Sequence, residues 1–285
     1  MRQRAISSIV VVLIGLVPAI VGGPLFAIVF ALIAMLAYHE LIAILGLEPD
    51  ILVMSGYALV AFAAIAAYSS PTRLFPVYVA LSIFLPVIIG VLDPQVEEDI
   101  LLRWGRVSVA SLYVGIAAFA AIALRQLEGV PKTGWFDSIG SGLTFTDRDT
   151  SIGLAWLLLA ILVTWLSDTV AYLVGRSVGR TPLIPRVSPK KTVEGAVGGF
   201  IAAGLTALIC ILVFGIDINP LTGLLVGLLL GGIGMLGDLC ESLLKRKAGI
   251  KDSGTLIPGH GGVLDRIDAL IFVIVATWLI VPFLT

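Results

Sequence analysis

The chain has 285 residues, of which 59% are hydrophobic and only 13% are charged, and its mean hydropathy is +1.09. A water-soluble domain usually carries about 25% charged residues, so this composition excludes an ordinary soluble fold. The formal net charge of −1 says little, because the charges are segregated along the chain. We expect a lipid bilayer as a partner of the chain and no nucleic acid.

Long apolar blocks recur along the chain, each close to the roughly 20 residues that a helix needs to span a bilayer. Backbone groups in lipid must bond internally, which favours helices, and the blocks are too long and continuous for β-barrel strands. We therefore predict an all-α polytopic membrane protein with about nine transmembrane helices. The predicted spans are 5–22, 24–46, 51–68, 74–92, 107–125, 151–175, 193–216, 220–238 and 267–284.

A polar loop at 126–150 divides these spans. It predicts an N-terminal transmembrane region of about five spans at 1–125 and a C-terminal catalytic region of about four spans with cytoplasmic loops at 151–285. The orientation follows from the basic residues, because cytoplasmic loops carry an excess of Lys and Arg. With a cytoplasmic N-terminus, that side receives all of the 18 Lys and Arg residues except Arg73, Arg125, Lys132 and Arg148.

A carboxylate inside an apolar segment marks the first polar constellation. Asp168 lies within the predicted span 151–175, where a charged carboxylate costs about 3 kcal/mol. Tyr172 follows four residues later and shares its helical face. The plain alternative is a carboxylate that hydrogen-bonds a neighbouring helix.

A basic pair follows this span. Pro189 breaks the helix, and Lys190 and Lys191 then precede the next span, which Ser188 or Thr192 could cap. An ordinary positive-inside anchor would give the same pair of lysines, so the pair alone does not define a site.

The end of the predicted span 220–238 carries the second constellation. Asp238, Glu241, Ser242 and Lys245 recur at i, i+3, i+4 and i+7, so that one helical face holds two carboxylates, a hydroxyl and an ammonium group. A solvated surface helix could show this pattern by chance, but here it continues directly from an apolar run.

A Gly-rich turn carries the third constellation, Lys251-Asp252 followed by Pro258-Gly-His260-Gly-Gly and Asp265-Arg266-Ile-Asp268. Its glycines permit close backbone approach and positive φ, and they lead into a helix whose first turn should offer free N–H groups to an anion. Asp265 and Asp268 face one way, and paired carboxylates beside phosphate-binding cations are typical of Mg²⁺ sites. The plain alternative is that Asp265 and Arg266 only cap the helix and reach to the membrane surface.

A weaker pair, His39 and Glu40, lies near the cytoplasmic end of the second span. The sequence leaves open whether this pair belongs to a site or bonds within the bundle.

The stretch from Ser242 to Asp268 resembles the signature of the phosphatidate cytidylyltransferase family. It matches the pattern S-x-x-K-R-x4-K-D-x5-P-G-H-G-G-x-x-D-R-x-D, and the upstream D-x-x-A-Y-x-x-G-R and S-P-K-K-T-x-E-G segments are also similar to the family's. The resemblance implies that CTP and phosphatidic acid react to give CDP-diacylglycerol and pyrophosphate. It also implies a homodimer and a second, monovalent cation such as K⁺ beside Mg²⁺.

On this reading the enzyme is a nucleotidyltransferase of phospholipid biosynthesis, in the inner (cytoplasmic) membrane, with its active site facing the cytoplasm. The hypothesis gives the metal to Asp238, Asp265 and Asp268, with Asp168 as a possible further ligand, and places His260 near the leaving pyrophosphate. Catalytic roles fall to the three metal carboxylates with Lys245 and Arg246. The groups expected to bind the phosphates of CTP and phosphatidate are Ser188, Lys190, Lys191, Lys245, Arg246, Lys251, His260 and Arg266, with Asp168 beside them.

Two other functions stay open from the residues alone. An ion-coupled transporter would use Asp168, Asp238 and Asp268 as intramembrane sites, but it would need them near the bilayer midplane and usually repeated halves. A CTP-dependent lipid kinase would use similar cations and transfer the γ-phosphate instead.

Overall fold

The structure, a computed structural model, describes residues 2–92, 99–133, 136, 149–257 and 261–284. Its contacts divide the chain into two compact units. The first unit holds residues 1–123 and 248–265, and the second holds 124–247 and 266–285. Each unit is described by itself below. The three-part division expected from the sequence stays a prediction.

The first unit is built from long helices in chain order, joined by short turns. The tightest turn uses two glycines with positive φ, Gly22 at 70° and Gly23 at 57°, where a side chain would be strained. Neighbours in the sequence pack on one another, α1 on α2, α2 on α3 and α3 on α4. The helices are α1 (Arg2–Val21), α2 (Gly23–Ile44), α3 (Ile51–Ser69), α4 (Pro71–Leu92) and α5 (Ile100–Arg125), whose last two residues belong to the second unit.

Two buried tyrosines explain two glycines in the first unit. The Tyr38 hydroxyl donates to the Val53 carbonyl at 3.1 Å, and a Cβ on Gly56 would lie 1.8 Å from that hydroxyl oxygen. Tyr78 likewise donates to Ser111 O at 2.6 Å, where Gly115 leaves the room. A buried hydroxyl needs a partner, and the glycines let it reach a backbone carbonyl.

Helix α5 begins earlier than predicted, at Ile100 instead of 107. Its first turns carry two arginines that a hydropathy reading leaves outside the helix. Arg103 pairs with Asp50, the N-cap of α3, and Arg106 donates to Leu45 O at 3.4 Å. The paired cations let the helix continue past the apolar run.

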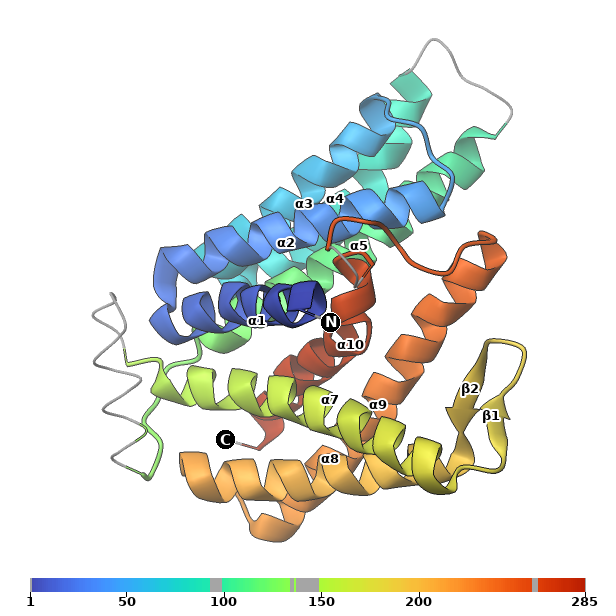
Figure 1. Ribbon diagram of the computed structural model, residues 1–285. Helices are drawn as coiled ribbons and strands as arrows, with labels where there is room; N and C mark the ends of the chain where they lie inside the picture. Colours follow the sequence, from blue (N-terminus) through green and yellow to red (C-terminus); the bar gives the residue numbers. More distant parts are fainter. Residues whose placement is uncertain (1, 93–98, 134–135, 137–148, 258–260, 285) are drawn as a thin grey trace. The chain divides into compact units, whose positions relative to one another are not determined.

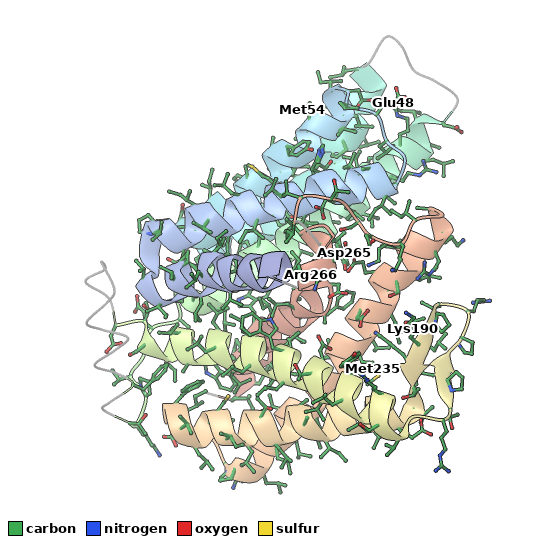
Figure 2. The ribbon with its side chains drawn as sticks, viewed as in Figure 1. Glu48, Met54, Lys190, Met235, Asp265 and Arg266 are labelled. Atoms are coloured by element: carbon green, nitrogen blue, oxygen red, sulfur yellow. The ribbon has the colours of Figure 1, made fainter. Side chains whose placement is uncertain are left out.

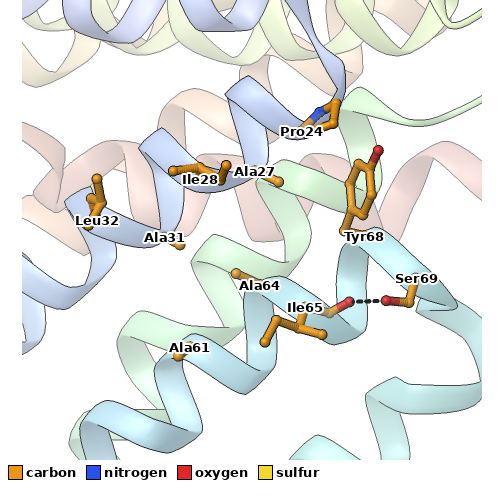
Figure 3. Close-up of a pocket in the computed structure, with 10 residues that line it drawn as sticks. All are labelled: Pro24, Ala27, Ile28, Ala31, Leu32, Ala61, Ala64, Ile65, Tyr68 and Ser69. Atoms are coloured by element: carbon orange, nitrogen blue, oxygen red, sulfur yellow. Dashed lines mark hydrogen bonds between the residues drawn. The ribbon is translucent and has the colours of Figure 1, made fainter. Parts of the chain in front are cut away.

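A shallow pocket of about 330 Å³ lies between α2 and α3 (Figure 3). The side chains around it are almost entirely apolar, and the hydroxyl of Ser69 is turned back to Ile65 O at 2.7 Å. The lining residues are Pro24, Ala27, Ile28, Ala31, Leu32, Ala61, Ala64, Ile65, Tyr68 and Ser69.

The described residues of the second unit form the long helices α7 to α10 and one β-hairpin. Helices α7 and α8 lie side by side, and α8 also packs on α9 (Figure 1). On α9, Gly223, Gly227 and Gly231 recur every four residues, and a Cβ on Gly227 would lie 2.5 Å from Ala203 O. Such small residues allow close helix contact in membranes. The elements are α7 (Ser151–Val178), β1 (Pro182–Ile184), β2 (Ser188–Thr192), α8 (Val193–Phe214), α9 (Pro220–Lys247), α10 (Leu264–Ile280) and the 3₁₀ turn η1 (Val281–Phe283).

The helices confirm the predicted fold class, an all-α multi-pass membrane protein. Among the described residues, eight helices are long and apolar enough to cross a bilayer, from α2 to the α10–η1 segment. The first predicted span corresponds to α1, whose described apolar part is Val12–Val21. One feature was missed: the residues between α7 and α8 form an antiparallel hairpin, with Pro182 opposite Thr192 and Ile184 opposite Ser188. Three- and five-residue strands give too short a pattern to stand out in the sequence.

Candidate functional site

The hairpin β1–β2 carries the predicted basic pair, and local hydrogen bonds hold it to the start of α8. Thr192 is the N-cap of α8, and its hydroxyl accepts the N–H of Gly195 at 3.1 Å. The Glu194 carboxylate accepts the backbone N–H groups of Arg180 at 3.1 Å and Thr181 at 3.2 Å. The T-x-E-G segment is thus a clamp that fixes both ends of the hairpin, and of the two caps that the sequence allowed, Thr192 is the one used.

Gly195 sets the distance between α7 and α8 at the base of the hairpin. A Cβ at this position would lie 2.6 Å from Ala171 O and 3.1 Å from Gly175 Cα. Both contacts are to backbone, so the helices themselves would have to move.

We expect Gly195→Ala to lower the stability of the protein by about 1–3 kcal/mol, because overpacking a close contact costs this much. The midpoint of thermal unfolding in detergent measures the effect. Gly232→Ala is the matched control, since its Cβ would meet Phe200 at an ordinary 3.6 Å and alanine favours the helix by about 1 kcal/mol. Equal midpoints for the two variants would contradict the prediction.

Four carboxylates of the second unit, Asp168 on α7, Asp238 and Glu241 on α9, and Asp268 on α10, form what we call the acidic cluster. Asp168 lies within electrostatic range of Asp238 and Asp268, and Asp268 lies within range of Asp238 and Glu241. Glu241 is fully buried, whereas Asp238 is about one quarter exposed. Three of the four were predicted site residues, and the structure brings them together from three helices.

Two lysines partly neutralise the acidic cluster. Lys191, from β2, forms an ion pair and hydrogen bond with Asp238 Oδ2, and Asp238 Oδ1 accepts the hydroxyl of Ser242 at 3.4 Å. Lys245 Nζ lies 3.0 Å from Glu241 Oε1, one helical turn away on α9. Counted against the four carboxylates, these two lysines alone leave a formal excess of two negative charges.

This donor set is chemically suited to a divalent cation, because hard metal ions take oxygen ligands. Among the described residues, no three His, Cys, Asp or Glu side chains are placed to hold a metal ion on their own. Mg²⁺ commonly uses one or two carboxylates together with substrate phosphates, so a substrate would supply the remaining ligands. The predicted metal set of Asp238, Asp265 and Asp268 stays a prediction.

Asp265 has a structural task in the first unit. Its Oδ2 accepts the backbone N–H groups of Ser253 and Gly262, both at 2.8 Å, and it lies in the first turn of α10 (Figure 2). A carboxylate at this position favours the helix N-terminus. The capping alternative is therefore realised for Asp265, beside whatever role it has toward a metal.

Three backbone N–H groups at the start of α10 are already bonded to side-chain oxygens of the chain. The N–H groups of Val263 and Leu264 donate to Glu40, each at 2.8 Å, and Asp265 N donates to Ser253 Oγ at 3.3 Å. The expectation that these three N–H groups are free for a substrate anion is wrong in this structure, because Glu40 occupies two of them and Ser253 the third. Glu40, which the sequence left undecided, is thereby placed at the Gly-rich turn.

The remaining predicted residues lie at exposed or half-exposed positions. Lys190 lies on β2 (Figure 2), Arg246 lies in the last turn of α9, and Arg266 lies in the first turn of α10. Ser188 begins β2 and is half-buried, and Lys251 is exposed in the first unit. His260 lies outside the described residues. Glu241 was not among the predicted site residues, although its i, i+3 spacing from Asp238 was an available signal.

Comparison with known proteins gives a family match over nearly the whole chain. The sequence model described as "Cytidylyltransferase family" matches residues 2–284. The chain is 44% identical over 136 residues to a phosphatidate cytidylyltransferase of Staphylococcus saprophyticus, which covers 48% of this chain and 52% of the relative. It is 38% identical over 169 residues to one of Bacillus subtilis, covering 59% and 55%. These alignments span about half the length of the curated relatives.

Proposed function

The chain belongs to the cytidylyltransferase family, and on this premise we propose that it is a phosphatidate cytidylyltransferase. It would convert CTP and phosphatidic acid to CDP-diacylglycerol and pyrophosphate, in phospholipid biosynthesis. The observation that carries the proposal is the acidic cluster with its two paired lysines, gathered from three membrane helices and a hairpin. Relatives named for this reaction support it.

The reaction needs no nucleophilic side chain. An oxygen of the lipid phosphate attacks the α-phosphorus of CTP, the bond from that phosphorus to the bridging oxygen breaks, and pyrophosphate leaves with the electron pair. The obstacle is electrostatic, because one polyanion approaches another. Catalysis of phosphoryl transfer is accordingly positioning plus charge stabilisation.

The two lysines paired with the acidic cluster supply positive charge that can move from a carboxylate to a substrate phosphate. Lys191 and Lys245 are held by carboxylates before substrate arrives, so each can exchange a carboxylate partner for a phosphate oxygen. Lys190 lies next to Lys191 on the hairpin and is exposed. We assign these three, with Arg246, Lys251, Arg266, Ser188 and His260, to the phosphates of CTP and phosphatidate.

We propose that Asp238 and Asp268, with Asp168 beside them, hold a Mg²⁺ ion, and that Asp265 belongs to the same set. The ion would neutralise phosphate charge and help pyrophosphate to leave. A second, monovalent cation such as K⁺ is part of the proposal, and the excess negative charge of the acidic cluster supports it.

We place the protein in the cytoplasmic membrane with its site facing the cytoplasm. The distribution of Lys and Arg supports this orientation, since the acidic cluster lies toward the ends of the helices that the positive-inside bias assigns to the cytoplasm. The resemblance to the family supports a homodimer.

Labelled CTP tests the reaction. Purified protein in detergent, given phosphatidic acid, Mg²⁺ and CTP, should transfer label from the α-phosphate into lipid, and label from the γ-phosphate should leave as pyrophosphate. Entry of γ-label alone would instead establish a lipid kinase. Entry of neither label would remove the proposed function and leave the transporter to be tested.

A further inference from the structure

Glu40 is a buried carboxylate that both family resemblance and site chemistry leave without a task. Its side chain is 6% exposed near the end of α2, and both of its oxygens are bonded. Oε1 accepts the N–H of Val263, and Oε2 accepts the N–H of Leu264, each at 2.8 Å. Oε2 also accepts the hydroxyl of Ser253 at 2.9 Å. The Glu40 carboxylate thus accepts three hydrogen bonds from residues near the start of α10.

Two glycines of the motif are required by this carboxylate. A Cβ on Gly262 would lie 2.3 Å from Glu40 Oε2, and a Cβ on Gly254 would lie 2.8 Å from Glu40 Oε1. A third glycine, Gly261, has φ of 83°, and its Cβ would lie 2.4 Å from Asp265 Oδ2. Gly254, Gly261 and Gly262 therefore make room for carboxylates of the protein itself.

We propose that Glu40 is a positioning residue for cytidylyl transfer, which holds Ser253, Val263 and the first residue of α10, Leu264, in their working conformation. The inference rests on the proposed function. Helix α10 carries Asp265 in its first turn, so the residue that fixes the start of the helix also fixes the backbone from which this carboxylate extends. Ser253 is the second member of the connection, because its hydroxyl donates to Glu40 and accepts from Asp265 N.

The Glu40 carboxylate occupies the place at the start of α10 where a substrate anion was expected. Its negative charge satisfies N–H groups that would otherwise be open and stabilises the helix N-terminus. Glutamine at position 40 would keep the size of the side chain, but its amide N–H₂ would face N–H and O–H donors. We therefore expect the turn to shift, and a displacement of about 1 Å lowers turnover by about 100-fold.

The test compares Glu40→Gln with Glu48→Gln in the full-length protein. Glu48 is exposed just beyond α2 (Figure 2), so this variant makes the same change of charge without touching the turn. We expect kcat per folded molecule to fall about 100-fold in Glu40→Gln, with KM for CTP within about 3-fold of the parent. Glu48→Gln should keep the parent's kcat. A Glu40→Gln kcat within 3-fold of the parent would overturn the proposal.

Ser253→Ala keeps the proposal testable if Glu40→Gln folds poorly. This milder variant removes one bond to Glu40, and we expect a loss of about 10-fold in kcat. The double variant should lose no more than Glu40→Gln alone, since residues that act through one connection are not additive. Multiplicative losses would contradict the proposal.

Hydrogen exchange separates this inference from the proposed function. The amides of Val263 and Leu264 should be protected in the parent protein and should exchange at least about 10-fold faster in Glu40→Gln, whatever reaction the protein catalyses. Failure of α-label transfer with these amides protected would remove the reaction and leave the connection. Unchanged exchange in the variant would remove the connection itself.

Discussion

Asp238→Asn should lower the turnover of CTP with phosphatidic acid by at least about 10³-fold while the protein stays folded. Asp238 pairs with Lys191, which we propose to bind a substrate phosphate, and it lies within electrostatic range of Asp168 and Asp268. Losing one charged group that stabilises a phosphoryl transition state commonly costs 10³–10⁵ in rate. Transfer of α-label from CTP into lipid measures the loss.

A second aspartate of the same unit provides the control for this substitution. Asp217 pairs with Lys132 at 2.5 Å, and both side chains are about 70% exposed, so Asp217→Asn makes the same chemical change in a solvated pair. Such pairs contribute about 0–1 kcal/mol, and turnover should stay near the parent value. Activity of Asp238→Asn within 10-fold of the control would remove Asp238 from the site.

Lys191→Gln should lower kcat/KM for CTP by about 10³-fold and, at the same time, lower the Mg²⁺ concentration that gives half-maximal rate. The first effect weakens the use of CTP, whereas the second strengthens the apparent affinity for Mg²⁺, and both have the same cause. Removing the ammonium group takes a cation away from the incoming triphosphate, and it also exposes Asp238 to the divalent ion that competes for the same oxygens. Rates measured over a matrix of CTP and Mg²⁺ concentrations separate the two effects.

Lys132→Gln removes the lysine of the exposed pair and should change neither quantity. A Lys191→Gln variant that needed more Mg²⁺ than the parent would show that the lysine and the metal do not compete, and the proposed exchange of partners at Asp238 would then be wrong. Complete loss of folding is not expected, since both groups of the Lys191–Asp238 pair are more than one quarter exposed.

The fold could be predicted from the sequence wherever apolar length decides. Transmembrane helices need long apolar runs, so their number and order follow from hydropathy. Helix ends follow less well, because Arg103 and Arg106 continue α5 through partners on other segments. The hairpin was missed because its strands have three and five residues, below the length at which alternation becomes informative.

The candidate site was predictable as a set of residues and much less so as a set of contacts. The spacing of Asp238 and Lys245 along one helix is visible in the sequence. In the structure, residues of this face contact one another, because Lys245 pairs with Glu241 and the hydroxyl of Ser242 donates to Asp238. The partner of Asp238 is 47 residues away, however, and no local pattern indicates which of two adjacent lysines it takes. The N–H groups after the Gly-rich turn were expected to be free for a similar reason. Their acceptor, Glu40, lies on α2, more than 200 residues earlier in the chain.

The separation between Glu40 and its partners also constrains how the protein can be made. Its three hydrogen-bond partners lie 213–224 residues further along the chain, so the ribosome synthesises them after nearly every other span. Until then the carboxylate at the end of α2 must remain hydrated, because burying it alone is costly. These hydrogen bonds can therefore form only after Leu264 has been synthesised, and we expect the nascent protein to stay inactive until then.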